Sequence, residues 1–315
     1  MKVLVPTAVD GLDALPDAEV VRFDAAEAIP TEHRDADVLV GWGIGDDRLA
    51  EAARTLPRLR LVQLLSAGSD AALAAGFAPG VAICSGRTLH DRPVAEHALA
   101  LVLAAARRLH TLVRAQLEHR WASELGGVQP EPSPGVFTTL RDARVTIWGY
   151  GSIGSTLAPH LQALGARVTG AATTARREGD VEVVDRDALP TLLESTDVLV
   201  MILPATDATR HALDADLLAR LPRHAWVVNV GRGATVDEAA LVAALEDGAL
   251  GGAALDVTEV EPLPATSPLW DRDDVILTPH AAGGRPLGAA ALVERTVRAL
   301  ADGAPLTNLV QVVGD

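Results

Sequence analysis

The chain has 315 residues, 49% of them hydrophobic, and a formal net charge of −15. This length predicts two ordinary domains with sizeable cores, and so negative a charge argues against nucleic acid or a membrane surface as a partner. Cys84 is the only cysteine, which excludes an internal disulfide and a metal site built from several thiolates.

The N-terminus has no pattern typical of a secretion signal, and the apolar run at residues 98–106 is too short to span a bilayer. A single cysteine also suits a reducing compartment. We therefore expect a cytoplasmic protein.

Two residue types are almost missing, since Lys2 is the only lysine and Tyr150 the only tyrosine. A Schiff-base lysine, a phosphate-loop lysine or a Tyr/Lys pair for hydride transfer would each have to use Lys2, which opens the first expected strand. The sequence contains neither G-x-S-x-G nor H-E-x-x-H, the motifs of acyl transfer and of zinc-dependent hydrolysis. The remaining chemistry is that of histidine, arginine and carboxylates.

A metal-dependent enzyme would need histidines and carboxylates at ligand spacing. Four histidines lie on or near one expected helix, namely His90, His97, His110 and His119. They have no acidic residues at the spacing that ligands require. We interpret them as surface or packing residues and expect no metal site.

The first third of the chain alternates short β-branched runs with helical patterns, which is typical of a parallel α/β lobe. Strands are expected at residues 2–6, 20–23, 37–40, 60–65 and 81–84. A long helix is expected from Pro93 to about Trp121, with Asp91 as its N-terminal cap. The Pro/Gly-rich stretch that follows, 126–135, is predicted to be an arm between subunits.

A second α/β lobe begins at residue 144. Its strands are expected at residues 144–148, 167–171, 197–203, 225–230, 252–257 and 275–278, with a helix in every gap. The last helical pattern, 288–301, and the apolar run 309–313 are expected to return to the first lobe. That lobe would then be discontinuous in sequence.

Residues 149–154 form a G-x-G-x-x-G pattern between an expected strand and an expected helix at 153–164. Gly149 permits the tight turn, Gly151 lets backbone N–H groups approach a pyrophosphate, and Gly154 lets helix and strand pack closely. The spacing alone also fits an ordinary strand-turn-helix, but the flanking βαβ pattern favours a dinucleotide site. The intervening residues are expected to complete this site, and they are Tyr150, Ser152 and Ile153.

The strand after this motif does not end in the acidic residue that binds the ribose hydroxyls of NAD. It runs instead into Thr173, Thr174, Ala175, Arg176 and Arg177. Hydroxyl and guanidinium groups accept a 2′-phosphate, so we predict that Thr173 and Arg176 bind it and that NADP(H) is favoured, with NAD(H) possible. The alternative is that Arg176 and Arg177 are solvated loop charges.

Three polar side chains follow three successive expected strands of the second lobe: Arg232, Glu261 and His280. Ligands bind outside the carboxyl ends of the strands in open α/β sheets, so these groups are expected to converge. Singly, they could be a solvated arginine, a turn carboxylate and a capping histidine. Three successive strand ends favour a catalytic site.

This trio suits hydride transfer between a nicotinamide and a small 2-hydroxy or 2-oxo acid. His280 would take the hydroxyl proton during oxidation and return it during reduction. Glu261, bonded to the far ring nitrogen, would fix the tautomer. Arg232 would hold the substrate carboxylate with its rigid fork of donors and polarise the keto oxygen.

These motifs resemble those of the D-isomer-specific 2-hydroxyacid dehydrogenases over nearly the whole chain. The matching stretches are residues 66–70, 93–100, 149–154, 229–233, 254–257, 261–263 and 278–284. Together they are highly specific, and the glyoxylate/hydroxypyruvate reductases are the members that the chain is most expected to resemble in activity.

The resemblance implies catalytic roles for Arg232, Glu261 and His280, with Asp256 near the nicotinamide amide. It also implies that the backbone at Ser66, Ala67 and Gly68 forms a cradle for the substrate carboxylate. Arg232 and His280 are the other residues expected to bind the substrate. Further positions expected to contact the cofactor are Val94, Pro204, Thr209, Val230, Gly231 and Gly283.

The family fold implied is two Rossmann-like or flavodoxin-like lobes with parallel sheets and the active site in the cleft between them. We place the substrate-binding lobe at residues 1–92 and 286–315, and the dinucleotide-binding lobe at residues 93–285. Family members are usually dimers joined through the cofactor lobe, and they close on binding. The hinge candidates are Arg92, Pro93 and residues 284–288.

Departures from the family pattern narrow the range of expected substrates. Formate-oxidising members have Gln where Glu261 stands, which argues against formate. Phosphoglycerate dehydrogenases often carry a further regulatory domain, for which a chain ending at Asp315 leaves no room. Glyoxylate or hydroxypyruvate reduction is therefore expected, with phosphoglycerate dehydrogenase-like activity as an alternative.

A non-catalytic, NAD(H)-sensing dimer is a second alternative, because some relatives act as transcriptional corepressors. Such a protein would need no substrate chemistry. The intact Arg232, Glu261 and His280 argue for the enzyme instead.

Overall fold

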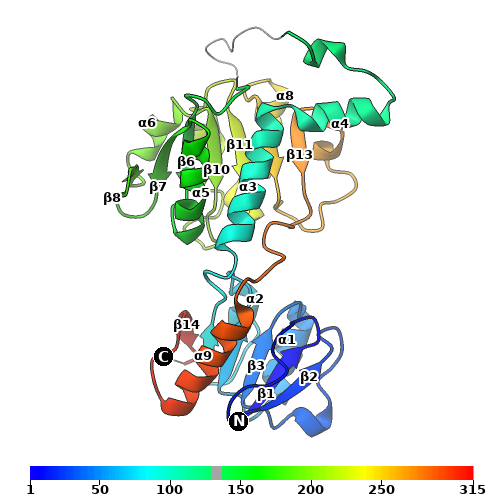
Figure 1. Ribbon diagram of the computed structural model, residues 1–315, viewed down its shortest axis with the longest axis vertical. Coiled ribbons are helices and arrows are strands. Elements are labelled where there is room, and N and C mark those ends of the chain that lie inside the picture. Colours follow the sequence, from blue (N-terminus) through cyan, green and yellow to red (C-terminus); the bar gives the residue numbers. More distant parts are fainter. Residues whose placement is uncertain (129–136, 315) are drawn as a thin grey trace. The chain divides into compact units, whose positions relative to one another are not determined.

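The computed structural model describes residues 1–128 and 137–314, which form two compact units (Figure 1). Unit 1 contains Met1–His90 and Arg285–Asp315, and unit 2 contains Asp91–Gly284. The chain therefore passes from one unit to the other at residues 90–91 and again at 284–285. Each boundary lies one or two residues before the position expected from the sequence.

Unit 1 is built on a six-stranded sheet with the order β14-β5-β4-β3-β1-β2. The strands are β1 (Lys2–Pro6), β2 (Glu19–Phe23), β3 (Val38–Gly41), β4 (Leu61–Leu64), β5 (Ala82–Cys84) and β14 (Leu309–Val312). Strands β1 to β5 pair in parallel, and β14 pairs antiparallel with β5. The order 2-1-3-4-5 is that of flavodoxin-like folds.

Helices cover both faces of this sheet because its central strands are buried on both sides, as β3 and β4 are along their whole length. The helices are α1 (Asp46–Thr55), α2 (Asp70–Ala74) and α9 (Ala289–Asp302). Leu292 and Val293 of α9 pack on one face. Leu49 of α1 and Ala72 of α2 pack on the other.

Unit 2 is built on an eight-stranded sheet with the order β13-β12-β11-β10-β6-β7-β9-β8. Its strands are β6 (Arg144–Trp148), β7 (Arg167–Ala171), β8 (Arg176–Glu178), β9 (Val181–Val184), β10 (Val198–Met201), β11 (Trp226–Asn229), β12 (Gly252–Leu255) and β13 (Val275–Leu277). All neighbours pair in parallel except β8 and β9. The strand order reverses between β6 and β10, which is where a Rossmann sheet binds its ligand.

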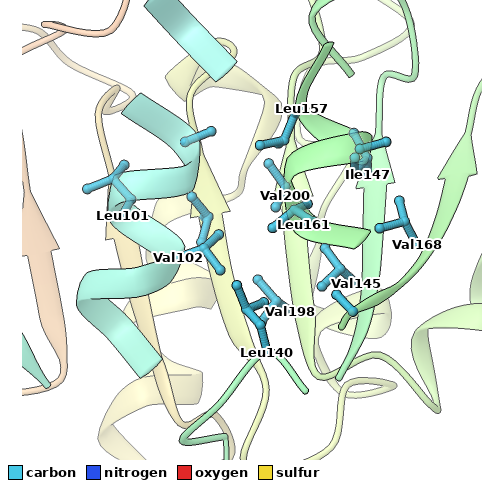
Figure 2. Close-up of a cluster of buried hydrophobic side chains, with 14 of the residues drawn as sticks. Leu101, Val102, Leu140, Val145, Ile147, Leu157, Leu161, Val168, Val198 and Val200 are labelled. Atoms are coloured by element: carbon cyan, nitrogen blue, oxygen red, sulfur yellow. The ribbon is translucent and has the colours of Figure 1, made fainter. Parts of the chain in front are cut away.

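Six helices of unit 2 are described: α3 (Asp91–Ala106), α4 (Leu109–Leu117), α5 (Ser152–Ala163), α6 (Leu189–Leu193), α7 (Ala215–Leu218) and α8 (Glu238–Glu246). Figure 2 shows the core under α3 and α5, where Val102 and Leu161 meet Val145 and Val200 of the central strands. Each fully buried leucine, such as Leu161, contributes about 1.5–3 kcal/mol through burial. Helices α6, α7 and α8 supply the core of the opposite face.

The predicted fold class, two parallel α/β sheets of the Rossmann or flavodoxin type, is confirmed, but the predicted helix from Pro93 to Trp121 is wrong. Helix α3 starts at Asp91 and ends at Ala106, and Arg108 takes a left-handed backbone conformation with φ 52° before α4. Contacts of α4 with the residues between η4 (Pro268–Asp271) and β13 explain the break. Arg114 donates hydrogen bonds to the Asp273 carboxylate and to the Arg272 carbonyl, both at 2.7 Å.

Two further local predictions are wrong. The gap between β12 and β13 contains only a short 3-10 helix, η4 (Pro268–Asp271), because prolines at 262, 264 and 268 disfavour a longer helix. The stretch after β7 is not a loop but the hairpin β8–β9, which turns at Gly179 with φ 59°. Residues 129–135 of the predicted arm lie outside the described residues.

Candidate active site

The glycine motif follows β6 at the point where the strand order reverses. Gly149 has φ 93°, and a Cβ there would lie 2.6 Å from the carbonyl oxygen of Ile202, which follows β10. A Cβ at Gly154 would lie 3.2 Å from Ile147 of β6. These two glycines therefore bring β6, β10 and α5 close together.

The third glycine faces open space instead. No atom lies within 4 Å of the place where a Cβ of Gly151 would be. This residue precedes α5, whose N-terminus has no side-chain cap. Uncapped N–H groups and the helix dipole favour an anion at this end, so these residues fit the pyrophosphate of a dinucleotide.

The motif's tyrosine is a packing residue. Tyr150 is buried in the core beneath α3 and α5, and its ring would contact a Cβ at Gly154 and at Gly170. Burial raises the pKa of its hydroxyl, and the Glu178 carboxylate adds to this effect while Arg176 opposes it.

Arg176 lies in β8 rather than in a loop. Its guanidinium group donates to the carbonyl oxygen of Tyr150 at 2.8 Å, and its Cζ atom lies 5.8 Å from the centre of that ring. It also pairs with Glu178 at 3.1 Å. Arg176 is therefore not in a loop, as one alternative had it, although its side chain is exposed to solvent. The side chain of Arg177 has no hydrogen bond or ion pair to the described residues.

A tight turn after β11 positions Arg232. Asn229, the last residue of β11, accepts a hydrogen bond from the Gly231 N–H at 3.0 Å and donates one to the Arg232 carbonyl at 3.1 Å. Thr235 donates to the same carbonyl at 2.6 Å. The guanidinium group donates to the Gly231 carbonyl at 2.7 Å, and the side chain is half-buried.

The next two strand ends bring Glu261 and His280 together. Nδ1 of His280 lies 2.8 Å from Oε2 of Glu261, and the other carboxylate oxygen accepts the N–H of Thr258 at 3.2 Å. A carboxylate can only accept, so Nδ1 carries the proton in this pair. No hydrogen bond to the described residues occupies Nε2 of His280, and the ring is partly exposed.

The loop that carries His280 is fixed by the buried carboxylate of Asp256. This group accepts hydrogen bonds from the Thr278 hydroxyl at 2.6 Å and from the N–H groups of Ala281 and Ala282 at 2.8 and 3.0 Å. His280 itself has φ 51° and donates its N–H to the Asp256 carbonyl at 2.8 Å. Asp256 thus positions the imidazole.

His97 completes this network, and the sequence interpretation of it as a surface or packing residue is wrong. Its Nε2 lies 3.0 Å from the Thr278 hydroxyl and 3.2 Å from Asp256. The motif at residues 93–100 contained this histidine, but nothing local in the sequence linked it to a carboxylate of another strand.

The remaining predicted cofactor residues lie in varied settings. Val94 is buried in the core beneath α3, and Val230 is buried directly after β11. Pro204 lies in the loop after β10, where its carbonyl accepts the Thr209 hydroxyl at 2.6 Å. Thr173 is exposed after β7, and Gly283 follows the two residues that bond Asp256.

The predicted carboxylate cradle belongs to unit 1. The Ser66 hydroxyl donates to the Gly68 carbonyl at 2.7 Å, and the Ser66 carbonyl accepts the Gly86 N–H at 2.7 Å. Ala67 and Gly68 are exposed or half-buried between β4 and α2.

Within residues 1–128 and 137–314, no three His, Cys, Asp or Glu side chains form a cluster that could hold a metal ion. No helix among the same residues has the length and apolar character needed to cross a bilayer.

Comparison with known proteins identifies the family. The family model described as the D-isomer specific 2-hydroxyacid dehydrogenase, NAD binding domain, matches residues 99–282. The chain belongs to this family. The dehydrogenase is 34% identical to a glyoxylate reductase of Aeropyrum pernix over 290 residues, which are 90% of this chain and 85% of that one.

Two solved structures resemble the dehydrogenase over almost its whole length. One is a D-isomer specific 2-hydroxyacid dehydrogenase from Xanthobacter autotrophicus in complex with NADPH and MES, with 34% identity, coverage of 98% and 97% of the two chains, and a TM-score of 0.80. The other is an NADPH-dependent glyoxylate/hydroxypyruvate reductase from Sinorhizobium meliloti in complex with NADP and sulfate, with 29% identity, coverage of 99% and 98%, and a TM-score of 0.81.

The family match covers most of unit 2 of the dehydrogenase. It includes the glycine motif, Arg232, Glu261 and His280, whereas the Ser66 cradle lies outside it. The predicted family and the prediction of an NAD(P)-dependent oxidoreductase are therefore confirmed.

Proposed function

We propose that this dehydrogenase reduces a small 2-oxo acid such as glyoxylate or hydroxypyruvate with NADPH to the corresponding 2-hydroxy acid, the D-isomer where C2 is a stereocentre, and catalyses the reverse oxidation. The observation that carries the proposal is the bond between His280 Nδ1 and Glu261 at 2.8 Å. It fixes the ring so that Nε2 is the atom left for the substrate. The similar proteins from Aeropyrum pernix and Sinorhizobium meliloti, a glyoxylate reductase and a glyoxylate/hydroxypyruvate reductase, support this substrate class.

A bound nicotinamide supplies the hydride chemistry. His280 supplies the proton: Nε2 gives it to the oxygen at C2 during reduction and takes it back during oxidation. Glu261 keeps Nδ1 protonated and stabilises the imidazolium form, because its carboxylate accepts a hydrogen bond from Nδ1–H whether the ring is neutral or charged. Asp256 holds the loop in place while the ring changes charge.

Arg232 binds the substrate carboxylate in this proposal. Its guanidinium group is a planar fork that matches a carboxylate with two parallel hydrogen bonds. The turn that carries it is fixed by Asn229 and Thr235, so the fork is presented by a rigid support. The Ser66, Ala67 and Gly68 segment of unit 1 is proposed as a second contact for the carboxylate.

We propose NADP(H) as the preferred cofactor, with the 2′-phosphate bound by Arg176 and Thr173. Residues 172–177, which follow β7 directly, include no acidic residue, and a guanidinium group is held beside the glycine loop by the Tyr150 carbonyl. The two solved relatives contain NADPH and NADP, which supports the same preference. The other proposed cofactor contacts are Val94, residues 149–154, Pro204, Thr209, Val230, Gly231, Asp256 and Gly283.

We also propose that the dehydrogenase is a homodimer. Helix α4 and the segment after it expose several large apolar side chains, which are Leu109, Leu112, Val113, Leu117 and Trp121. Exposed apolar patches of this kind mark interaction surfaces.

The test is a panel of 2-oxo acids assayed with NADPH and with NADH. We expect reduction of glyoxylate or hydroxypyruvate, a loss of about 10²–10⁴-fold in kcat for His280→Ala, and losses in both kcat and affinity for Arg232→Lys, since a point charge cannot replace the fork. His160→Ala, which removes an exposed histidine from α5, is the matched control and should retain full rate. If no acid oxidises either cofactor, or if His280→Ala keeps full rate, the proposal is wrong.

A further inference from the structure

The guanidinium group of Arg176 is already engaged by a carboxylate of its own strand. Its Nε and Nη2 atoms lie 3.2 and 3.1 Å from Oε2 of Glu178, and Nη2 also donates to the Tyr150 carbonyl at 2.8 Å. Two of the three guanidinium nitrogens, Nε and Nη2, are therefore already used by a carboxylate and a backbone carbonyl.

This pairing follows from the sequence of the hairpin. Side chains two residues apart on a strand lie on the same face, so Arg176 and Glu178 of β8 are neighbours. The turn at Gly179 leads into β9, which fixes the register of β8 at the edge of the sheet (Figure 1). Arg177 lies on the opposite face, across from Glu182 of β9.

A phosphate bound to Arg176 would meet this carboxylate in two ways. It would have to replace Glu178 as the partner of the fork, and it would lie close to a like charge. The side chains are 38% and 45% exposed, so solvent screens the pair and makes Glu178 a modest competitor rather than a block.

We propose that Glu178 is a specificity-determining residue, which lowers the preference for NADP(H) over NAD(H) by competing with the 2′-phosphate for Arg176. This inference rests on the proposed function, in which Arg176 binds that phosphate. The carboxylate that NAD-specific sites place after the second strand of the fold is missing, and a carboxylate two residues beyond the arginine takes over part of its effect.

The experiment measures equilibrium binding by calorimetry on the full chain, without turnover. The ligands are NADP⁺, NAD⁺ and 2′,5′-ADP, and the variants are Glu178→Gln, Arg176→Gln and the double variant. Glu182→Gln is the matched control, because it removes the same charge from the same hairpin on the face away from Arg176. All three substituted positions are exposed, and thermal melting checks that each variant folds.

For Glu178→Gln we expect the dissociation constants of NADP⁺ and 2′,5′-ADP to fall about threefold to fivefold, a change of the size typical of an exposed ion pair. The dissociation constant of NAD⁺ should not change. Raising the salt from about 0.05 M to about 0.5 M should reduce this gain, since it screens the competing charge. In the Arg176→Gln background the gain should disappear. Glu182→Gln should leave all three constants unchanged.

Two outcomes overturn the inference while leaving the cofactor proposal standing. If Glu178→Gln weakens NADP⁺ binding, Glu178 supports Arg176 instead of competing with the phosphate; if it changes nothing while Arg176→Gln still weakens NADP⁺, there is no competition. A different result overturns the cofactor proposal itself: Arg176→Gln binds NADP⁺ and NAD⁺ in the same ratio as the wild type does.

Discussion

The imidazole of His280 is held at three points. Glu261 fixes Nδ1, and the Asp256 carbonyl accepts the backbone N–H at 2.8 Å. The Asp256 carboxylate then bonds the two N–H groups that follow at 281 and 282. In the proposed reaction, a ring held in this way would lose little freedom when it bonds the substrate, which is the preorganisation that proton transfer requires.

The single thiol of the chain gives a pH-dependent prediction. Cys84 is fully buried in β5, and burial raises the pKa of its thiol from 9.0 to about 11. The native thiol should therefore not react with a disulfide reagent at pH 8, whereas the protein in denaturant should react at once with one equivalent. Rapid reaction of the native protein would contradict the burial.

The raised pKa of the Cys84 thiol also predicts how the stability of the protein changes with pH. An acid whose pKa is higher in the folded state keeps its proton there, so between pH 9 and about 11 the unfolded chain binds fewer protons than the native one. The free energy of unfolding should fall as the pH rises through this window. Cys84→Ser, measured by urea denaturation over the same range, should lose that part of the dependence.

The candidate trio could be predicted from the sequence because Arg232, Glu261 and His280 follow strands that the sequence already showed, and parallel strands end at one edge of the sheet. His97 could not be predicted in this way. It meets Thr278 across 181 residues of sequence, a contact set by the packing of α3 on the sheet. The pairing of Arg176 with Glu178 needed the hairpin, which was predicted as a loop.

At the scale of elements, the turn after β11 packs directly on the loop that carries Glu261. A Cβ at Gly233 would lie 1.8 Å from the carbonyl oxygen of Thr258, and that residue's N–H bonds Glu261. This contact joins the Arg232 turn to the Glu261 loop through backbone atoms alone.

Gly233→Ala should therefore force the two loops apart. We expect a destabilisation of about 3 kcal/mol or more, because backbone must move, and a loss of turnover together with weaker substrate affinity. Urea denaturation and steady-state kinetics measure the two effects. The control is Gly45→Ala, because a Cβ at that position meets nothing within 4 Å. It should change neither the stability nor the kinetics by a comparable amount. An active, stable Gly233→Ala would show that the loops are not coupled.

The elements predicted best were strands, because a buried parallel strand is a continuous apolar run bounded by polar residues. The helix break at Arg107 and Arg108 carried no glycine or proline, so periodicity continued through it. Tertiary contacts show why the chain turns there. Arg114 bonds the residues just before β13, and the ring centres of His110 and Trp226 lie 5.5 Å apart. Tertiary contacts overrode the local pattern.

At the scale of the whole molecule, the net charge of −15 opposes self-association, so a dimer needs an apolar surface to form. Helix α4 and the segment after it offer one. The side chains of Leu117 and Trp121 are 74% and 91% exposed, which is unusual for such large apolar groups.

We therefore expect the wild type to sediment at twice the chain mass of 32.8 kDa. The double variant Leu117→Glu with Trp121→Glu should sediment near the mass of one chain, because burying two carboxylates in an apolar interface costs several kcal/mol. Leu164→Glu adds a carboxylate at another exposed leucine, beyond α5, and should leave the dimer intact. Analytical ultracentrifugation distinguishes these outcomes: a monomeric wild type contradicts the dimer, and a dimeric double variant places the interface elsewhere.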